Sequence, residues 1–118
     1  MNVKKRMAAF RYAWEGIIHG LQTERHMQYH ALSALVVVSA GWWTGLTVTE
    51  WCLVILLIGG MFAFELMNAA VERVVDLVTD EYALLAKRAK DVAAGAVLVY
   101  AMTSAVIGCF IFLPKWFG

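Results

Sequence analysis

The sequence predicts an all-α integral membrane protein in which an amphipathic amino-terminal surface helix precedes three transmembrane helices. Of its 118 residues, 62% are hydrophobic and 16% are charged, whereas a soluble domain carries about 25% charged residues. Only helices and closed barrels satisfy their backbone groups in lipid, and a spanning helix needs about 20 mostly apolar residues. Three segments of this kind occur in the chain. Composition and segment length therefore give the fold class.

The amino-terminal segment combines helical periodicity with many charges. Met7, Phe10 and Trp14 recur at three- and four-residue spacing, while basic and acidic side chains fill the other faces. This pattern is typical of an amphipathic helix that lies in the membrane interface. We expect residues 1–28 to form this helix and residues 29–118 to form a three-span membrane domain, the whole being one functional domain.

The three spans are expected at about residues 30–49, 51–78 and 88–114. The first and the third contain uncharged runs that are long enough to cross the hydrocarbon. The second begins as an apolar run at Trp51 but gains polar and acidic residues after Phe64. The second span is therefore the unusual one, and the chemistry is expected there.

Basic residues are distributed unevenly around the expected spans. Five precede the first span and four lie between the second and the third, whereas the carboxyl end carries Lys115 alone. Cytoplasmic flanks of membrane helices are enriched in Lys and Arg. We therefore expect the amino terminus inside the cell and the carboxyl terminus outside.

Four polar residues of the second span follow a helical repeat. Glu65, Asn68, Glu72 and Asp76 are three, four and four residues apart, which places them on one stripe of one helix. A rise of about 1.5 Å per residue puts Glu65 about 21 Å beyond Trp51. Ionisable side chains inside a membrane are costly and usually functional. The alternative is a structural role, in which the carboxylates pair across helices with lysine or arginine.

Further charged residues are expected at the cytoplasmic rim. Glu24 ends the surface helix, Glu72 lies near the boundary of the second span, and Lys90 and Asp91 open the third. This set suits Mg²⁺ with phosphate oxygens, because Mg²⁺ usually takes one or two carboxylates together with phosphates and waters. The chain has no G-x-x-x-x-G-K motif, so a nucleotide site here is not a P-loop.

Two other kinds of site are disfavoured. The formal net charge of +1 argues against a nucleic-acid partner, which requires a basic face. His26 and His30 are one helical turn apart and could share a metal, but no third ligand is evident. Packing at the membrane interface is the preferred interpretation of both histidines.

A longer pattern supports a specific assignment. The residues E-x-x-N-x-x-x-E-x-x-x-D from Glu65 to Asp76, followed by Ala89-Lys90-Asp91, resemble the signature of the small bacterial diacylglycerol kinase family. The resemblance covers nearly the whole chain. The stretch 56–62, the run 23–25 and the ending 111–115 are most similar to the Gram-positive branch, which is known for undecaprenol kinases.

The resemblance implies an ATP- and Mg²⁺-dependent lipid kinase that phosphorylates the hydroxyl of a membrane lipid. Undecaprenol is the expected substrate, and diacylglycerol is the alternative. Glu65 matches the general base, with Asn68 beside it, and Glu24 and Glu72 match the Mg²⁺ ligands. The residues that match nucleotide-binding positions are Lys5, Tyr12, Glu24, Glu72, Glu81, Tyr82, Lys90 and Asp91.

The resemblance also implies a homotrimeric helical bundle in the bacterial cell membrane. One departure is Ala69-Ala70, where many members carry a hydroxyl residue after the asparagine. A small proton-coupled transporter is a distant alternative, because such carriers also use an intramembrane acid. A carrier favours one deep acid that is accessible from both sides. The polar residues of this chain are instead graded towards one membrane face, which favours the kinase.

Overall fold

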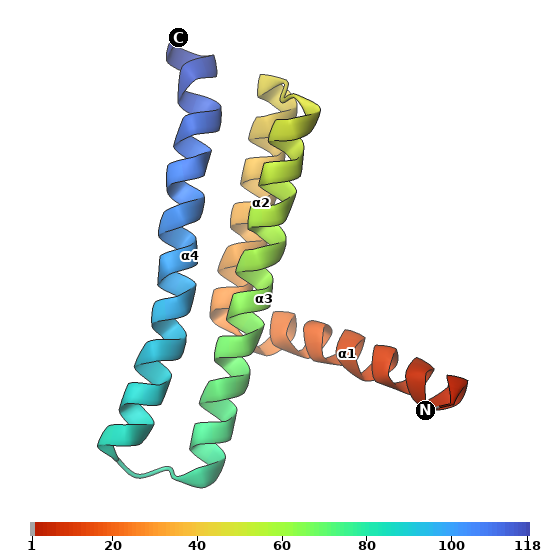
Figure 1. The fold of residues 1–118 in the computed structure, drawn as a ribbon, viewed down its shortest axis with the longest axis vertical. Helices are drawn as coiled ribbons and strands as arrows, with labels where there is room; N and C mark the ends of the chain where they lie inside the picture. The colour runs from red at the N-terminus through yellow and green to blue at the C-terminus, as the bar shows by residue number, and fades with distance from the viewer. Residues whose placement is uncertain (1) are drawn as a thin grey trace.

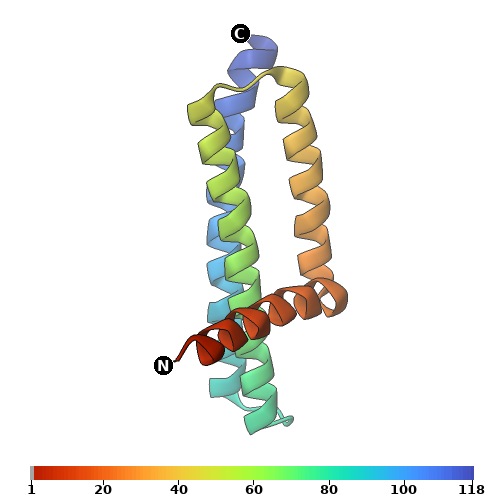
Figure 2. The ribbon, with the colours of Figure 1, turned by 90° about the vertical axis from the view of Figure 1, so that its right-hand side faces the viewer.

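The computed structural model describes residues 2–118, which fold into four α-helices. Three of them run side by side along the long axis of the molecule, while α1 lies across them (Figures 1 and 2). The ends of α3 and α4 that meet in the loop after Val78 extend past α1 (Figure 1). The predicted all-α fold class is confirmed. The helices are α1 (Val3–Thr23), α2 (Arg25–Thr44), α3 (Val48–Val78) and α4 (Leu84–Phe117).

Two of the helices are long and apolar enough to cross a membrane, α3 with 31 residues and α4 with 34. They coincide with the second and third expected spans. The helix in the place of the first expected span is α2, whose 20 residues would extend about 30 Å. It is more polar than α3 and α4, since its first two turns include Gln28 and His30. The three-span topology therefore remains a prediction.

The boundary between α1 and α2 lies at Glu24, four residues earlier than the expected end of the surface helix at residue 28. Glu24 has extended backbone angles (φ −97°, ψ 116°), and its N–H donates to the Gly20 carbonyl. A Cβ atom on Gly20 would come within 2.9 Å of the Leu66 side chain. This close approach places the end of α1 at the level of Leu66 on α3.

The link between α2 and α3 is a tight turn. Gly45 ends α2 in the left-handed conformation (φ 82°), which glycine adopts without strain. Thr47 and Glu50 then form a capping box at the start of α3, with hydrogen bonds of 3.2 Å and 2.9 Å.

The carboxyl end of α4 is fastened to this turn. Lys115 Nζ lies 3.0 Å from Glu50 Oε1, and Trp116 Nε1 donates to Thr44 Oγ1 at 2.9 Å. Both contacts come from residues beyond Pro114, where the sequence predicted the last span to end. They give α4 partners for one more turn, and the helix continues to Phe117.

The interior of residues 2–118 is small. The buried hydrophobic residues are Met27, Val54, Ala69, Ile111 and Phe112. Many large apolar side chains on all four helices are exposed, for example Trp42 at 83%. Such surfaces are expected to be covered by lipid or by other subunits.

One close contact fixes the packing of α3 against α4. The Tyr100 hydroxyl donates to the Leu56 carbonyl at 3.0 Å, and its ring lies over Gly60. A Cβ atom on Gly60 would overlap the Tyr100 hydroxyl, whereas the neighbouring Gly59 faces open space. Gly60 therefore has the packing role expected for small residues between membrane helices.

Candidate active site

The polar stripe of α3 changes from buried to exposed along the helix. Glu65 is 3% exposed and Asn68 is 7% exposed, Glu72 is half-buried, and Asp76 is exposed. The Asn68 amide donates from Nδ2 to Glu72 Oε1 at 3.4 Å, whereas its Oδ1 is buried with no hydrogen-bond partner among the described residues. A carboxylate beside an unsatisfied acceptor is a site that can receive a cation or a hydrogen-bond donor.

The buried carboxylate of Glu65 faces a histidine of α2. His30 Nε2 lies 3.8 Å from Glu65 Oε2, and the Glu65 side chain is 4% exposed. The sequence singled out Glu65 but interpreted His30 as an interfacial packing residue. A histidine in the second turn of a helix gives no signal by itself that it will face an acid on another helix.

Glu24 is held at the turn of α3 that carries Glu72. Arg73 donates from Nη2 to Glu24 Oε1 at 2.7 Å and to Thr23 Oγ1 at 3.2 Å. The two predicted Mg²⁺ ligands, Glu24 and Glu72, thus belong to neighbouring parts of the fold. Sequence reasoning missed Arg73, although its position directly after Glu72 could have suggested it.

Four of the eight expected nucleotide-binding residues line a pocket of about 270 Å³ between the end of α3 and the start of α4. Two ion pairs lie in its lining. Lys90 Nζ lies 2.5 Å from Asp76 Oδ1, and Lys87 Nζ lies 2.5 Å from Asp91 Oδ2. The expected residues that line this pocket are Glu81, Tyr82, Lys90 and Asp91.

The other four expected nucleotide-binding residues lie elsewhere. Two of them, Glu24 and Glu72, belong to the contact between the end of α1 and α3 described above. Lys5 and Tyr12 are exposed on α1 and do not line this pocket. The guanidinium of the neighbouring Arg11 lies over the Tyr12 ring, 5.2 Å from the ring centroid. Within one chain, therefore, the structure does not bring Lys5 and Tyr12 together with Lys90 and Asp91.

The carboxylates at the rim fit a magnesium ion that is shared with a substrate. No cluster of three or more His, Cys, Asp or Glu side chains that could hold a metal occurs within residues 2–118. Mg²⁺ does not need such a cluster when phosphates and waters complete its coordination. Glu72, with the unsatisfied Asn68 Oδ1 beside it, and Glu24, which contacts the next residue Arg73, would offer oxygen ligands of the kind that Mg²⁺ prefers.

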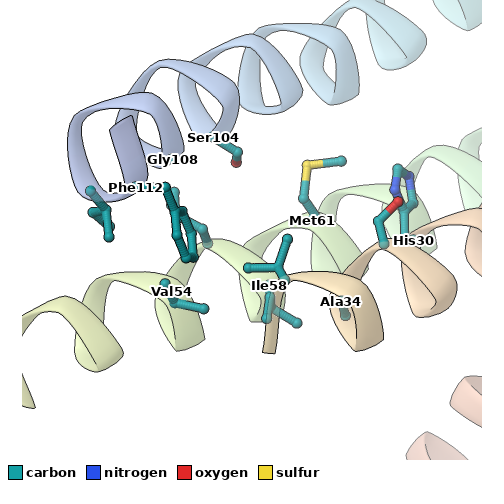
Figure 3. Close-up of a pocket in the computed structure, with 12 residues that line it drawn as sticks. His30, Ala34, Val54, Ile58, Met61, Ser104, Gly108 and Phe112 are labelled. Carbon is teal, nitrogen blue, oxygen red and sulfur yellow. The ribbon is translucent and has the colours of Figure 1, made fainter. Parts of the chain in front are cut away.

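A second cavity, of about 210 Å³, lies between α2, α3 and α4. Its walls are apolar and include Ala34, Ile58, Met61 and Phe112, while His30 lies at one end (Figure 3). The cavity therefore ends at the histidine that faces Glu65.

Comparison with known proteins gives a consistent result. The family model described as prokaryotic diacylglycerol kinase matches residues 11–112. An undecaprenol kinase of Bacillus subtilis is 50% identical over 91% of this chain and 87% of that protein. A diacylglycerol kinase of Synechocystis is 37% identical over 92% of this chain and 62% of that protein. A diacylglycerol kinase of Escherichia coli is 29% identical over 91% of this chain and 87% of that protein.

Proposed function

Because the chain belongs to the prokaryotic diacylglycerol kinase family and is a lipid kinase, we propose that it transfers the γ-phosphoryl group of ATP to the hydroxyl of undecaprenol. The observation that carries the chemistry is the α3 stripe, which leads from a buried carboxylate at Glu65 to a charged pocket at Asp76 and Lys90. The choice of undecaprenol rests on the identity of 50% with the Bacillus subtilis undecaprenol kinase.

The position of α1 supports the proposed depths of the lipid hydroxyl and of ATP relative to the membrane surface. An amphipathic helix lies at the boundary between lipid head groups and acyl chains, and the end of α1 is level with Leu66. Glu65, the residue before Leu66, is then at this boundary, which is the depth of a lipid hydroxyl group. The ends of α3 and α4 that extend past α1 (Figure 1) reach into water, where ATP is available.

The same placement gives the proposed topology. The helices α2, α3 and α4 lie side by side and α1 lies across them (Figure 2). In the proposed topology these three helices cross the bilayer and α1 lies on its cytoplasmic face. The amino terminus is inside and the carboxyl terminus is outside, as the distribution of basic residues favours. The protein is a multi-pass protein of the bacterial cell membrane.

The proposed reaction is a direct in-line transfer. Glu65 accepts the proton of the lipid hydroxyl, the hydroxyl oxygen bonds to the γ-phosphorus of ATP, and the bond to ADP breaks. Asn68, three residues from Glu65 on the same stripe and with an unsatisfied Oδ1, orients the reacting groups in this proposal. Glu24 and Glu72 would hold Mg²⁺, which would supply neutralisation of the phosphate charge. Catalysis of this kind depends on positioning and electrostatic stabilisation.

The nucleotide is proposed to bind between two subunits of a homotrimer. Lys90, Asp91 and the loop residues Glu81 and Tyr82 line its pocket on one subunit. The α1 helix of a neighbouring subunit supplies the positions of Lys5 and Tyr12, which are remote from that pocket within one chain. Ligand pockets bury most of their ligand, and the exposed apolar faces of the helices provide surfaces for the subunit contacts.

The substrate assignment is tested by phosphorylation of undecaprenol and diacylglycerol side by side in one detergent with radiolabelled ATP. We expect the higher kcat/KM for undecaprenol, with the label recovered in undecaprenyl phosphate. The Glu65→Gln variant provides the inactive control. A preference for diacylglycerol would assign the chain to the activity named for the relatives at 37% and 29% identity.

A further inference from the structure

His30 has an unusual combination of surroundings. Its ring is mostly buried, with 21% of the side chain exposed, and its Nε2 atom lies 3.8 Å from Glu65 Oε2. That Nε2 atom is buried and has no hydrogen-bond partner among residues 2–118. A buried polar atom without a partner requires an explanation, because it loses its hydrogen bonds to water.

The other basic groups near the stripe have different partners. Arg73 pairs with Glu24, and Lys90 pairs with Asp76. The Asn68 amide donates to Glu72. Within the described chain, His30 is thus the basic side chain that faces Glu65 within 4 Å. A carboxylate that is removed from water needs such a partner.

We infer that His30 is a positioning residue for the general base: its Nε2–H donates to Glu65 Oε2 and leaves Oε1 free to accept the proton of the lipid hydroxyl. This inference rests on the proposed role of Glu65. An imidazole protonated on Nδ1 alone would point a lone pair at the carboxylate, so the proton must be on Nε2 for the contact to be attractive. The distance of 3.8 Å between His30 Nε2 and Glu65 Oε2 is slightly too long for a hydrogen bond. Catalytic hydrogen bonds often shorten when substrate binds.

The surroundings of the pair support this role. The His30 ring also borders the apolar cavity, near Ala34 and Met61 (Figure 3). Apolar walls leave few competing partners for Nε2, and a low local dielectric strengthens the bond to the carboxylate. An orienting group behind a general base is a recurring arrangement in enzymes.

Two substitutions of His30 separate its hydrogen bond from its volume. His30→Leu fills the space without a donor, and we expect kcat to fall about 10- to 100-fold, the usual effect of losing an orienting partner, with the KM for MgATP unchanged. His30→Gln keeps an amide N–H near the position of Nε2 and should restore most of kcat. His26→Leu is the matched control, since His26 is an exposed histidine one turn earlier on α2, and it should behave as the wild type.

A spectroscopic measurement tests the contact without turnover. The protein is labelled with ¹⁵N-histidine in detergent micelles, and the Nε2 resonance of His30 is compared in the wild type and in Glu65→Gln. We expect this resonance to shift, while that of His26 does not. In activity assays, His30→Leu combined with Glu65→Gln should be no slower than Glu65→Gln alone, because the histidine acts through the glutamate.

The outcomes are distinct. A folded His30→Leu protein with wild-type kcat, a His30→Gln protein as slow as His30→Leu, or an unchanged Nε2 resonance would each overturn the inference. The proposed function fails separately, if the wild type phosphorylates neither lipid or if Glu65→Gln remains active.

Discussion

The carboxyl group of Glu65 is the most deeply placed acid of the α3 stripe, at 3% exposure. Its replacement in Glu65→Gln keeps the size of the side chain and its hydrogen bonds but removes the ability to accept a proton. We expect kcat to fall at least about 100-fold, as for the loss of a general base. MgATP binding, measured by titration calorimetry, should be little changed. Glu72→Gln should instead weaken that binding, and similar behaviour of the two variants would contradict the division of roles.

The ion pair between Arg73 and Glu24 would compete with the Mg²⁺ proposed at Glu24. The pair is partly exposed, with 50% of the arginine side chain and 24% of the glutamate side chain accessible, so it contributes about 1 kcal/mol at most. Arg73→Gln should therefore lower the Mg²⁺ concentration for half-maximal activity by up to about fivefold. The control is Arg88→Gln, because Arg88 is an exposed arginine that forms no ion pair within residues 2–118. An increased Mg²⁺ requirement in Arg73→Gln would show that the arginine assists binding instead.

The residues that form the stripe could be predicted individually, because side chains three or four residues apart lie on the same face of a helix. The burial of Glu65 and Asn68 agrees with that prediction. The partners of the stripe could not be predicted, because His30 and Arg73 meet their acids across helices. Sequence periodicity describes one helix and carries no information about which residue of another helix lies opposite.

At the scale of helices, Gly60 provides a sharp test of the α3–α4 packing. Gly60→Ala would place a methyl group against the Tyr100 ring, and such overpacking costs about 1–3 kcal/mol. We expect a lower Tm for this variant in detergent. Gly59→Ala is the matched control, since its methyl group would meet open space and alanine favours the helix by up to about 1 kcal/mol. Equal Tm values for the two variants would rule out the packing role.

Helix positions were predicted better than helix ends. The apolar and amphipathic patterns located all four helices, because they extend over many turns. The sequence analysis placed Glu24 at the end of the surface helix, but the boundary at residue 28 was four residues too late, since no glycine or proline marks the break and the helical pattern continues on both sides. The extension of α4 beyond Pro114 was also missed, because it depends on the contacts of Lys115 and Trp116 with the α2–α3 turn.

At the scale of the whole molecule, topology is tested by cysteine labelling in intact cells. In a background without Cys52 and Cys109, Val48→Cys and Leu84→Cys place thiols at exposed positions. Val48 is the first residue of α3 and Leu84 is the first residue of α4. A membrane-impermeant reagent should label position 48 and should reach position 84 only after the cells are lysed. The reverse pattern would invert the proposed orientation.

The proposed shared site predicts complementation between two inactive variants. Tyr12→Ala damages the α1 contribution and Asn68→Ala damages the α3 contribution of the same pocket. When the two proteins are refolded together, mixed trimers should contain some pockets with both surfaces intact, and activity should exceed that of either parent. Crosslinking verifies that mixed trimers form. Mixed trimers without recovered activity would place each pocket within a single subunit.

The small interior of the chain has a consequence for every stability measurement. Five buried hydrophobic side chains among the described residues cannot by themselves maintain 117 ordered positions against their conformational entropy. We therefore expect folding to be coupled to the binding of amphiphiles and, in the proposed trimer, of neighbouring subunits, so that the transition temperature obeys mass action. It should rise with protein concentration and with detergent chain length, and variants are comparable only at one fixed ratio of amphiphile to protein.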